Sequence, residues 1–317
     1  MGADITSGAA LAGMVDGVVL LDKPSGMSSN AALQVVRRLF WRVKAGHTGT
    51  LDPLATGLLP VCLGDATKFA GGLLGADKTY DAIIRLGMAT TTGDADGEPL
   101  LSASPEGCLE RLPQTLAWLT GEIDQLPPMF SAIKHHGRPL YQYARAGQTV
   151  ERRARRVTIY ALELVSVSGL DVLLRVRCSK GTYIRSLAHE IGERLGCGAH
   201  VRGLRRVGIG RLKIEEAVEL NALAALTELE RVNRLRPADV LLADLPAVTV
   251  DPARAEALLQ GRTVEMAEGQ ALGRVRLYAQ NGEFLGLGAG AESGLLSPKR
   301  MRARRLTRTA LASADLA

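Results

Sequence analysis

AGHTGTLDPLATG, residues 45–57, is a segment of unusual composition. Its glycines, threonines and single proline show neither the 3.6-residue period of a helix nor the alternation of a strand, so it predicts an irregular loop. The loop contains a single carboxylate, Asp52. Because Asp-Pro pairs commonly begin turns, a purely structural turn is one interpretation. A functional loop is the other, because long loops without periodicity often carry binding or catalytic residues.

Strands and helices alternate irregularly on both sides of this loop. Before it, GVVLL at residues 17–21 is typical of a buried strand, and a helix capped by Ser28, Ser29 or Asn30 extends to about residue 41. After it, the apolar spacing predicts strands at 58–63, 78–86, 157–167, 172–178 and 200–213, and helices at 65–74, 106–119 and 182–195. This order favours an α+β fold over a doubly wound parallel sheet.

The two ends of the chain differ from this central part. Residues 1–16 are rich in Ala and Gly and predict a flexible tail. Pro237, Pro246 and Pro252 interrupt the pattern and indicate a domain boundary. Beyond the boundary, a short helix at 253–260 is followed by apolar runs on either side of Asn281-Gly282, which predict a hairpin. We therefore expect a main domain at residues 17–245 and a small β-rich domain at 246–317.

Composition excludes some classes of protein. With 46% hydrophobic and 23% charged residues, the chain is not intrinsically disordered. The 39 basic and 33 acidic residues give a net charge of +6, and Arg greatly outnumbers Lys. Nucleic-acid binding explains this charge, and so does codon bias in a GC-rich genome.

The four cysteines have no CxxC spacing, so neither a zinc site nor a disulfide scaffold is expected. The N-terminal residues lack the apolar run of a signal peptide or membrane span, so we expect a cytoplasmic protein without membrane association.

Several cofactor motifs are also missing from the sequence. It has no GxxxxGK[ST] phosphate loop, no GxSxG elbow and no HExxH zinc motif. The glycines at 286, 288 and 290 are not followed by a predicted helix, so they do not indicate dinucleotide binding. The chain is therefore an enzyme without an evident cofactor or metal, or a binding protein.

Two further segments carry candidate functional residues. In CSKGTYIR, residues 178–185, Arg185 falls at the start of the predicted helix, where the helix dipole disfavours a cation. A nearby anion would resolve this conflict, and a solvent-exposed side chain would as well. Arginines also cluster at 152–156 and again at 202–206, the first cluster near Phe130, Tyr141 and Tyr143. Such clusters are typical of solvated faces or of surfaces that bind phosphates and stack bases.

Taken together, these segments resemble the TruB-type family of tRNA pseudouridine synthases. The resemblance runs in order through residues 17–215 and is weaker beyond them. The matching stretches are GVVLLDKPSGMSSN (17–30), GHTGTLDPLATGLLPVCLGDATK (46–68), KTYDA (78–82), LPPMFSAIKHHGRPLYQYARAG (126–147), CSKGTYIRSLAHEIG (178–192) and HVRGLRRVGIG (200–210).

The resemblance implies a fold and an activity. It implies a mixed, largely antiparallel sheet with flanking helices, an insertion at 126–156 that grips RNA, and a small C-terminal PUA-like RNA-binding domain. The implied reaction isomerises uridine 55 in the T-loop of tRNA to pseudouridine, by base flipping and without cofactor or metal. The implied partner is the T-arm and elbow of tRNA, and a monomer is expected. Two alternatives remain open, a tRNA-folding chaperone that acts by binding alone and an enzyme for ribosomal or spliceosomal uridines.

The resemblance also implies roles for individual residues. Asp52 is the catalytic residue, and Arg185 is its charge partner. Tyr80 stacks on the flipped base and is a candidate base for a late deprotonation, while Tyr183 and Leu204 line the uracil pocket. His47 contacts the RNA or caps the loop, and Lys23 supports the loop or reaches a phosphate. For Asp52, desolvation would raise the pKa and an adjacent guanidinium would lower it.

Overall fold

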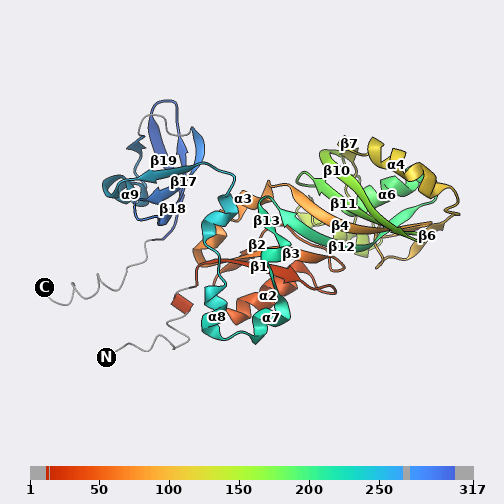
Figure 1. Cartoon of the computed structure of the whole chain (residues 1–317), viewed down its shortest axis with the longest axis horizontal. Helices are drawn as coiled ribbons and strands as arrows, with labels where there is room; N and C mark the ends of the chain where they lie inside the picture. Colours follow the sequence, from red (N-terminus) through yellow and green to blue (C-terminus); the bar gives the residue numbers. More distant parts are fainter. Residues whose placement is uncertain (1–11, 14, 267–271, 304–317) are drawn as a thin grey trace.

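The computed structural model describes residues 12–13, 15–266 and 272–303, and in this part of the chain the largest unit is a ten-stranded sheet (Figure 1). Most neighbouring strands are antiparallel, and the pairs β14–β1 and β3–β12 are parallel. The predicted α+β class with a mixed, largely antiparallel sheet is therefore confirmed. The order across the sheet is β14 (Val218–Glu219), β1 (Gly17–Lys23), β3 (Thr56–Leu63), β12 (Ala199–Ile209), β4 (Lys78–Leu86), β11 (Asp171–Cys178), β10 (Arg155–Ser168) and β7 (Gly121–Gln125), with β2 (Ala45–His47) beside β3 and β13 (Leu212–Lys213) beside β12.

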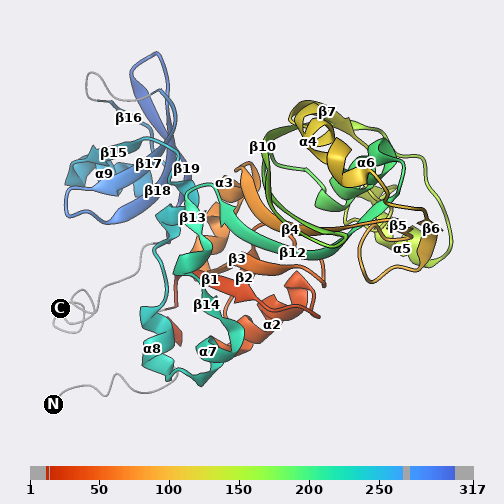
Figure 2. The same cartoon turned by 45° about the vertical axis from the view of Figure 1, so that its right-hand side comes forward.

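Helices flank the two ends of this sheet. At the end that contains β1 lie α2 (Ser29–Leu39), α7 (Leu220–Ala225) and α8 (Glu228–Asn233), and at the other end lie α4 (Cys108–Trp118) and α6 (Ile184–Leu195) (Figures 1 and 2). Ser28 is the N-cap of α2, where its hydroxyl accepts a hydrogen bond from the Ala31 N–H at 3.1 Å. One of the three predicted caps is thus confirmed.

Alternate residues of β1 enter two different hydrophobic clusters. Val19 and Leu21 pack with α2 and α6 in the main core, whereas Val18 and Leu20 pack on the opposite face of the sheet. Side chains alternate between the two faces of a strand, so a strand covered on both faces reads as a continuous apolar run. This explains the GVVLL pattern. The second cluster also contains residues of η1 (Gly64–Phe69), α3 (Gly71–Leu74) and η3 (Ala238–Leu242).

A second sheet of five strands is formed by residues 247–301. The hairpin predicted around Asn281-Gly282 is present, because β17 and β18 pair antiparallel across it. This sheet contacts the main body, where the rings of Phe284 and Phe69 lie 5.2 Å apart and the Tyr278 hydroxyl donates to Asp239 at 2.6 Å. Its elements are β15 (Ala247–Val250), α9 (Pro252–Leu259), β16 (Val264–Glu265), β17 (Gly273–Ala279), β18 (Phe284–Gly290) and β19 (Leu295–Met301).

The smaller elements lie in the connections. The segment 126–154 leaves the main sheet after β7 and returns in β10, and it contains the helix α5. The remaining elements are β5 (Met88–Thr90), β6 (Pro99–Ser102), β8 (Lys134–His135), β9 (Arg138–Pro139), α5 (Leu140–Arg145) and η2 (Ile214–Glu216).

Three predicted elements differ from those observed. The predicted helix at 65–74 is instead η1 followed by α3, and Gly72 there packs so tightly that a Cβ would lie 2.3 Å from the Leu241 carbonyl oxygen. The predicted strand at 200–213 is interrupted at Gly210, whose φ of +54° turns the chain. Helix α6 begins at Ile184 rather than at residue 182, because Tyr183 has an extended backbone.

Most of the predicted tail, residues 1–11 and 14, lies outside the described residues. Of those described, Val15 is buried, and Asp16 accepts a hydrogen bond from the Ala66 N–H at 2.9 Å and pairs with Arg302 at 2.7 Å. Within the described ranges, no helix combines the length and apolar character needed to cross a membrane.

Candidate active site

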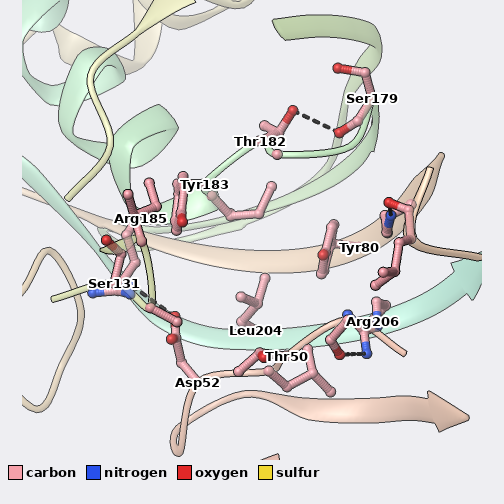
Figure 3. Close-up of a pocket in the computed structure, with 18 residues that line it drawn as sticks. Thr50, Asp52, Tyr80, Ser131, Ser179, Thr182, Tyr183, Arg185, Leu204 and Arg206 are labelled. Carbon is pink, nitrogen blue, oxygen red and sulfur yellow. Dashed lines mark hydrogen bonds and ion pairs between the residues drawn. The ribbon is translucent and has the colours of Figure 1, made fainter. Parts of the chain in front are cut away.

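A pocket of about 400 Å³ opens beside β4 and β12 (Figure 3). A volume in this range is usual for a site that takes a small molecule or a single base. Five of the seven predicted site residues line it, from four separate parts of the chain. They are Asp52 from the loop after β2, Tyr80 from β4, Tyr183 and Arg185 from the start of α6, and Leu204 from β12.

The loop that carries Asp52 is fixed by contacts at both of its ends. Ser29, at the first turn of α2, accepts from the Leu51 N–H at 2.8 Å and donates to the Leu51 carbonyl at 3.0 Å. At the other end, Gly57 has a φ of +102° and lies directly against the backbone of Arg206. Both anchors belong to regular elements, so the loop is held rigidly although it has no periodicity of its own.

Asp52 and Arg185 form an ion pair in the pocket. The Arg185 Nε lies 2.8 Å from the Asp52 Oδ2, and the arginine side chain is only 5% exposed. Backbone carbonyls hold the other guanidinium nitrogens, since Nη1 donates to Thr92 at 3.0 Å and Nη2 donates to Phe130 at 2.7 Å. The anion expected near the start of α6 is therefore present, and the guanidinium is fixed from three directions.

A second carboxylate, Asp94, reaches the same arginine. Its Oδ2 lies 3.6 Å from the Arg185 Nε, and its Oδ1 accepts from the Thr92 hydroxyl at 2.5 Å. Asp94 is buried, and sequence reasoning missed it because the polar stretch 90–97 also contains Asp96 and gives no periodic signal. That Asp94 is buried beside Arg185 depends on the tertiary fold, so the sequence alone does not indicate it.

These surroundings raise the pKa of Asp52 above its ordinary value of 3.8. Burial is the largest cause, the charge of Asp94 adds to it, and Arg185 and Lys23 oppose it without cancelling it. Of the two opposing effects expected from the sequence, desolvation therefore prevails. A carboxylate with a raised pKa is a stronger base when it is ionised, which suits proton transfer or nucleophilic attack.

Both tyrosines of the pocket are largely withdrawn from solvent. Burial raises the pKa of Tyr80, and the positive charge of Arg206 acts in the opposite direction. Burial also raises the pKa of Tyr183, and the positive charges of Arg155 and Arg185 oppose this rise. In Figure 3 the rings of Tyr80 and Tyr183 and the side chain of Leu204 surround the space next to Asp52. Flat and apolar groups are therefore placed where a planar base could stack.

Arg206 is a second pocket residue that the sequence analysis missed. We grouped it with the basic cluster at 202–206, yet its side chain is 1% exposed. Its Nε donates to the Leu58 carbonyl at 2.8 Å, and its Nη2 donates to the Gly49 carbonyl at 2.9 Å. A signal was available, because residues 204 and 206 share one face of a strand and Leu204 was predicted to face the pocket.

Lys23 and His47 do not line the pocket. Lys23 is fully buried, and its Nζ donates to the carbonyls of Pro24 at 2.8 Å and Met27 at 2.7 Å. Its Nζ also lies 3.4 Å from the Pro53 carbonyl, next to Asp52, and burial lowers its pKa to about 8. This placement fits the loop-supporting interpretation of Lys23. His47 lies on β2 opposite Val61, and burial lowers its pKa.

The segment after β7 brings positive charges and aromatic rings together. A pocket of about 370 Å³ is lined by Lys134, His135, Arg152, Arg153 and Arg155 among others. Arg152 donates to the Pro127 carbonyl at 2.9 Å, and the guanidinium of Arg138 lies 4.7 Å from the centre of the Tyr143 ring. In the described part of the chain, no three His, Cys, Asp or Glu side chains form a group that could hold a metal ion.

Comparisons with known proteins match nearly all of the described chain. Three family models match in sequence: "TruB family pseudouridylate synthase (N terminal domain)" at residues 37–184, "tRNA pseudouridylate synthase B C-terminal domain" at 185–243 and "Pseudouridine synthase II TruB, C-terminal" at 246–301. Proteins called tRNA pseudouridine synthase B from Aromatoleum aromaticum and Azoarcus sp. are 54% and 55% identical to the chain. Each alignment covers 91% of this chain, and 93% and 95% of the respective relative.

Solved structures show the same architecture. The chain superposes on a protein of the archaeal box H/ACA sRNP Nop10–Cbf5 complex with a TM-score of 0.70 and 26% identity, covering 93% of this chain and 90% of that one. A chain of an H/ACA RNP bound to a substrate RNA containing 2′-deoxyuridine gives a TM-score of 0.70 at 27% identity, with 93% and 87% covered.

Proposed function

The chain belongs to the TruB family of pseudouridine synthases and isomerises uridine in tRNA, and from this premise we propose that its target is uridine 55 in the T-loop, flipped into the pocket beside Asp52. The observation that carries the proposal is the Asp52–Arg185 ion pair at a pocket lined by Tyr80, Tyr183 and Leu204. A protein that only bound RNA would have no need for a carboxylate of raised pKa there.

We expect the nucleotide to leave its stack in order to react. Asp52 lies in a pocket lined by side chains from four parts of the chain, which supports a flipped base as the form that enters. Flipping a base costs a few kcal/mol, and stacking on an aromatic ring recovers about 1–3 kcal/mol of it. Tyr80, which lines the pocket from β4, supplies such a ring.

The reaction needs a negatively charged carboxylate in a site from which water is displaced. The bond between C1′ and N1 breaks, the uracil rotates, and C1′ bonds to C5; C5 loses a proton and N1 gains one. The ionised Asp52 carboxylate can attack the ring, attack C1′ or abstract the proton that leads to a glycal, and each route begins from the same charged group. Arg185 stabilises that charge as the incoming base displaces water. Tyr80 is in position to take up the C5 proton at the end.

We assign the remaining parts of the chain to binding the T-arm and elbow of tRNA. We assign residues 17–245 to catalysis, 126–156 to an insertion that holds the T-loop, and 246–317 to a PUA-like RNA-binding domain. The arginines and rings around the pocket of 134–155 suit phosphates and stacked bases. His47, on β2 close to the catalytic loop, is assigned to the RNA contact beside it. We expect the chain to act as a monomer.

The test uses unmodified tRNA transcript and chemical mapping of pseudouridine. We expect one pseudouridine, at position 55, and none in a transcript that carries cytidine there. Asp52→Asn removes the charge but keeps the shape, so this variant should bind the transcript normally and form no product.

Two results would contradict the proposal. Pseudouridine confined to another position would show that the target uridine is wrong. Turnover by Asp52→Asn close to that of the wild type would show that the catalytic assignment is wrong. If the wild type formed no product but accelerated tRNA folding, the alternative of a tRNA-folding chaperone that acts by binding alone would replace the proposal.

A further inference from the structure

Arg206 is a buried cation that lies beside the pocket without an acidic partner. It is among the largest fully buried side chains of the described chain. None of the ion pairs found between described residues includes it, although twelve other arginine or lysine side chains do pair. A buried charge without a counter-ion costs free energy, because its hydration is lost and no carboxylate replaces it.

The contacts of Arg206 indicate what this buried charge does for the site. Its Nη2 donates to the Gly49 carbonyl, three residues before Asp52, and its Nε donates to the Leu58 carbonyl, just after the same loop. The guanidinium therefore joins both ends of the catalytic loop, which lies between β2 and β3. Five donors in one rigid plane allow an arginine to make such contacts at once, and a lysine lacks this geometry.

The same residue also lies against the opposite wall of the pocket. Arg206 is the register partner of Tyr80 in the antiparallel β12–β4 pair, and both residues line the pocket. The Arg206 backbone adds a further constraint, because Gly57 lies so close that a Cβ there would be 2.3 Å from the Arg206 carbonyl oxygen. One residue thus connects the loop of Asp52 with the strand whose ring faces it (Figure 3).

We propose that Arg206 is a positioning residue for the isomerisation, fixing the Asp52 loop and the Tyr80 phenol at the spacing that the flipped uridine requires. The proposal rests on the function proposed above. Arg206 acts through Gly49 and Tyr80 rather than on the reacting atoms. Its role therefore predicts a loss in the chemical step and not in tRNA binding, since a misplacement of about 1 Å at a reacting group can cost about 100-fold in rate.

The experiment compares Arg206→Lys and Arg206→Gln with the wild type in single-turnover reactions on saturating tRNA transcript. Affinity is measured separately by filter binding, and folding is measured by circular dichroism. The matched control is Arg175→Lys on β11, which is separated from β12 by β4. The Arg175 guanidinium pairs with Asp81, and its side chain is 51% exposed. We expect both Arg206 variants to lose about 100-fold in rate with unchanged affinity, and the control to keep the wild-type rate.

Tyr80→Phe gives a second measurement that a merely structural role would not affect. If Arg206 acts partly through the phenol, the double variant Arg206→Lys with Tyr80→Phe loses less rate than the product of the two single losses. Full multiplicativity, a wild-type rate in a folded Arg206 variant, or an equal loss of rate and affinity would each overturn the proposal. Failure of both Arg206 variants to fold would also overturn it, because Arg206 would then serve the fold alone. An inactive wild type would refute the proposed function instead, so the two failures are distinguishable.

Discussion

Asp52 and Arg185 meet at 2.8 Å, although 132 positions separate them in the chain, and the arginine is also 3.6 Å from Asp94. One guanidinium therefore serves two carboxylates. Burial is the main reason that the pKa of Asp52 stays raised beside this cation, and the charge of Asp94 adds to the rise. Asp52 therefore has an ion-pair partner and still has a raised pKa.

Removal of Arg185 should reduce both stability and activity. Arg185→Met leaves the buried carboxylate of Asp94 and the partly exposed carboxylate of Asp52 without their cation. We expect a loss of about 3 kcal/mol in the free energy of unfolding, at the low end for a broken buried pair because solvent screens Asp52. The rate should fall by about 100-fold or more near neutral pH and recover partly at higher pH, where Asp52 ionises without its partner. Urea unfolding and single-turnover rates across pH measure the two effects. Arg175→Met, on the exposed face, should show neither effect, and a pH-independent loss would contradict the electrostatic explanation.

The acid limb of the pH–rate profile should report the raised pKa of Asp52. The ionised carboxylate is the active form, so the rate should rise with pH through a midpoint above 3.8, the ordinary value. Asp94→Asn removes a neighbouring negative charge and should move this midpoint to lower pH. Single-turnover rates at saturating tRNA give the profile. A midpoint that moved upward in Asp94→Asn would show that Asp94 acts mainly by holding Arg185.

Lys23 should make the stability of the fold depend on pH in an unusual direction. Its pKa is about 8 in the folded protein and 10.5 when unfolded, so the unfolded chain binds more protons between these values. The destabilisation is complete below about pH 8 and is relieved as the pH rises toward 10.5. Relative to Lys23→Met, the wild type should therefore gain about 2 kcal/mol in unfolding free energy between about pH 7.5 and pH 9.5. Urea melts of both proteins across this range provide the measurement, and a constant difference would show that the amine keeps its ordinary pKa.

Two glycines of positive φ should respond differently to alanine. At Gly57 a Cβ would strain the backbone and meet the Arg206 carbonyl at 2.3 Å, so Gly57→Ala should cost about 3 kcal/mol or more in unfolding free energy. At Gly26, whose φ is +80°, a Cβ meets nothing within 4 Å, and Gly26→Ala should cost only about 1–2 kcal/mol. Urea unfolding of both variants tests the difference. Equal costs would show that backbone strain alone matters at Gly57.

The sequence alone predicted the elements that depend on local periodicity. The strand at 17–21, the cap at Ser28 and the hairpin at Asn281-Gly282 follow from the spacing of apolar residues and from turn chemistry, which neighbouring residues determine. The helix at 65–74 failed because the reason for its interruption lies elsewhere. Gly72 packs on the Leu241 carbonyl, a contact with a segment far along the chain.

The candidate site likewise contains some residues that the sequence predicted and others that only the structure identifies. The composition of the loop drew attention to Asp52 and the start of the predicted helix drew attention to Arg185, whereas Tyr80 was identified only through the family resemblance. Only the tertiary structure shows the roles of two further residues. In the sequence, Asp94 belongs to a polar stretch and Arg206 to a basic cluster, whereas in the structure both are buried beside the site. The tertiary structure also determined the direction of the Asp52 pKa shift, because desolvation depends on every segment that closes over a group, and no local pattern records which segments those will be.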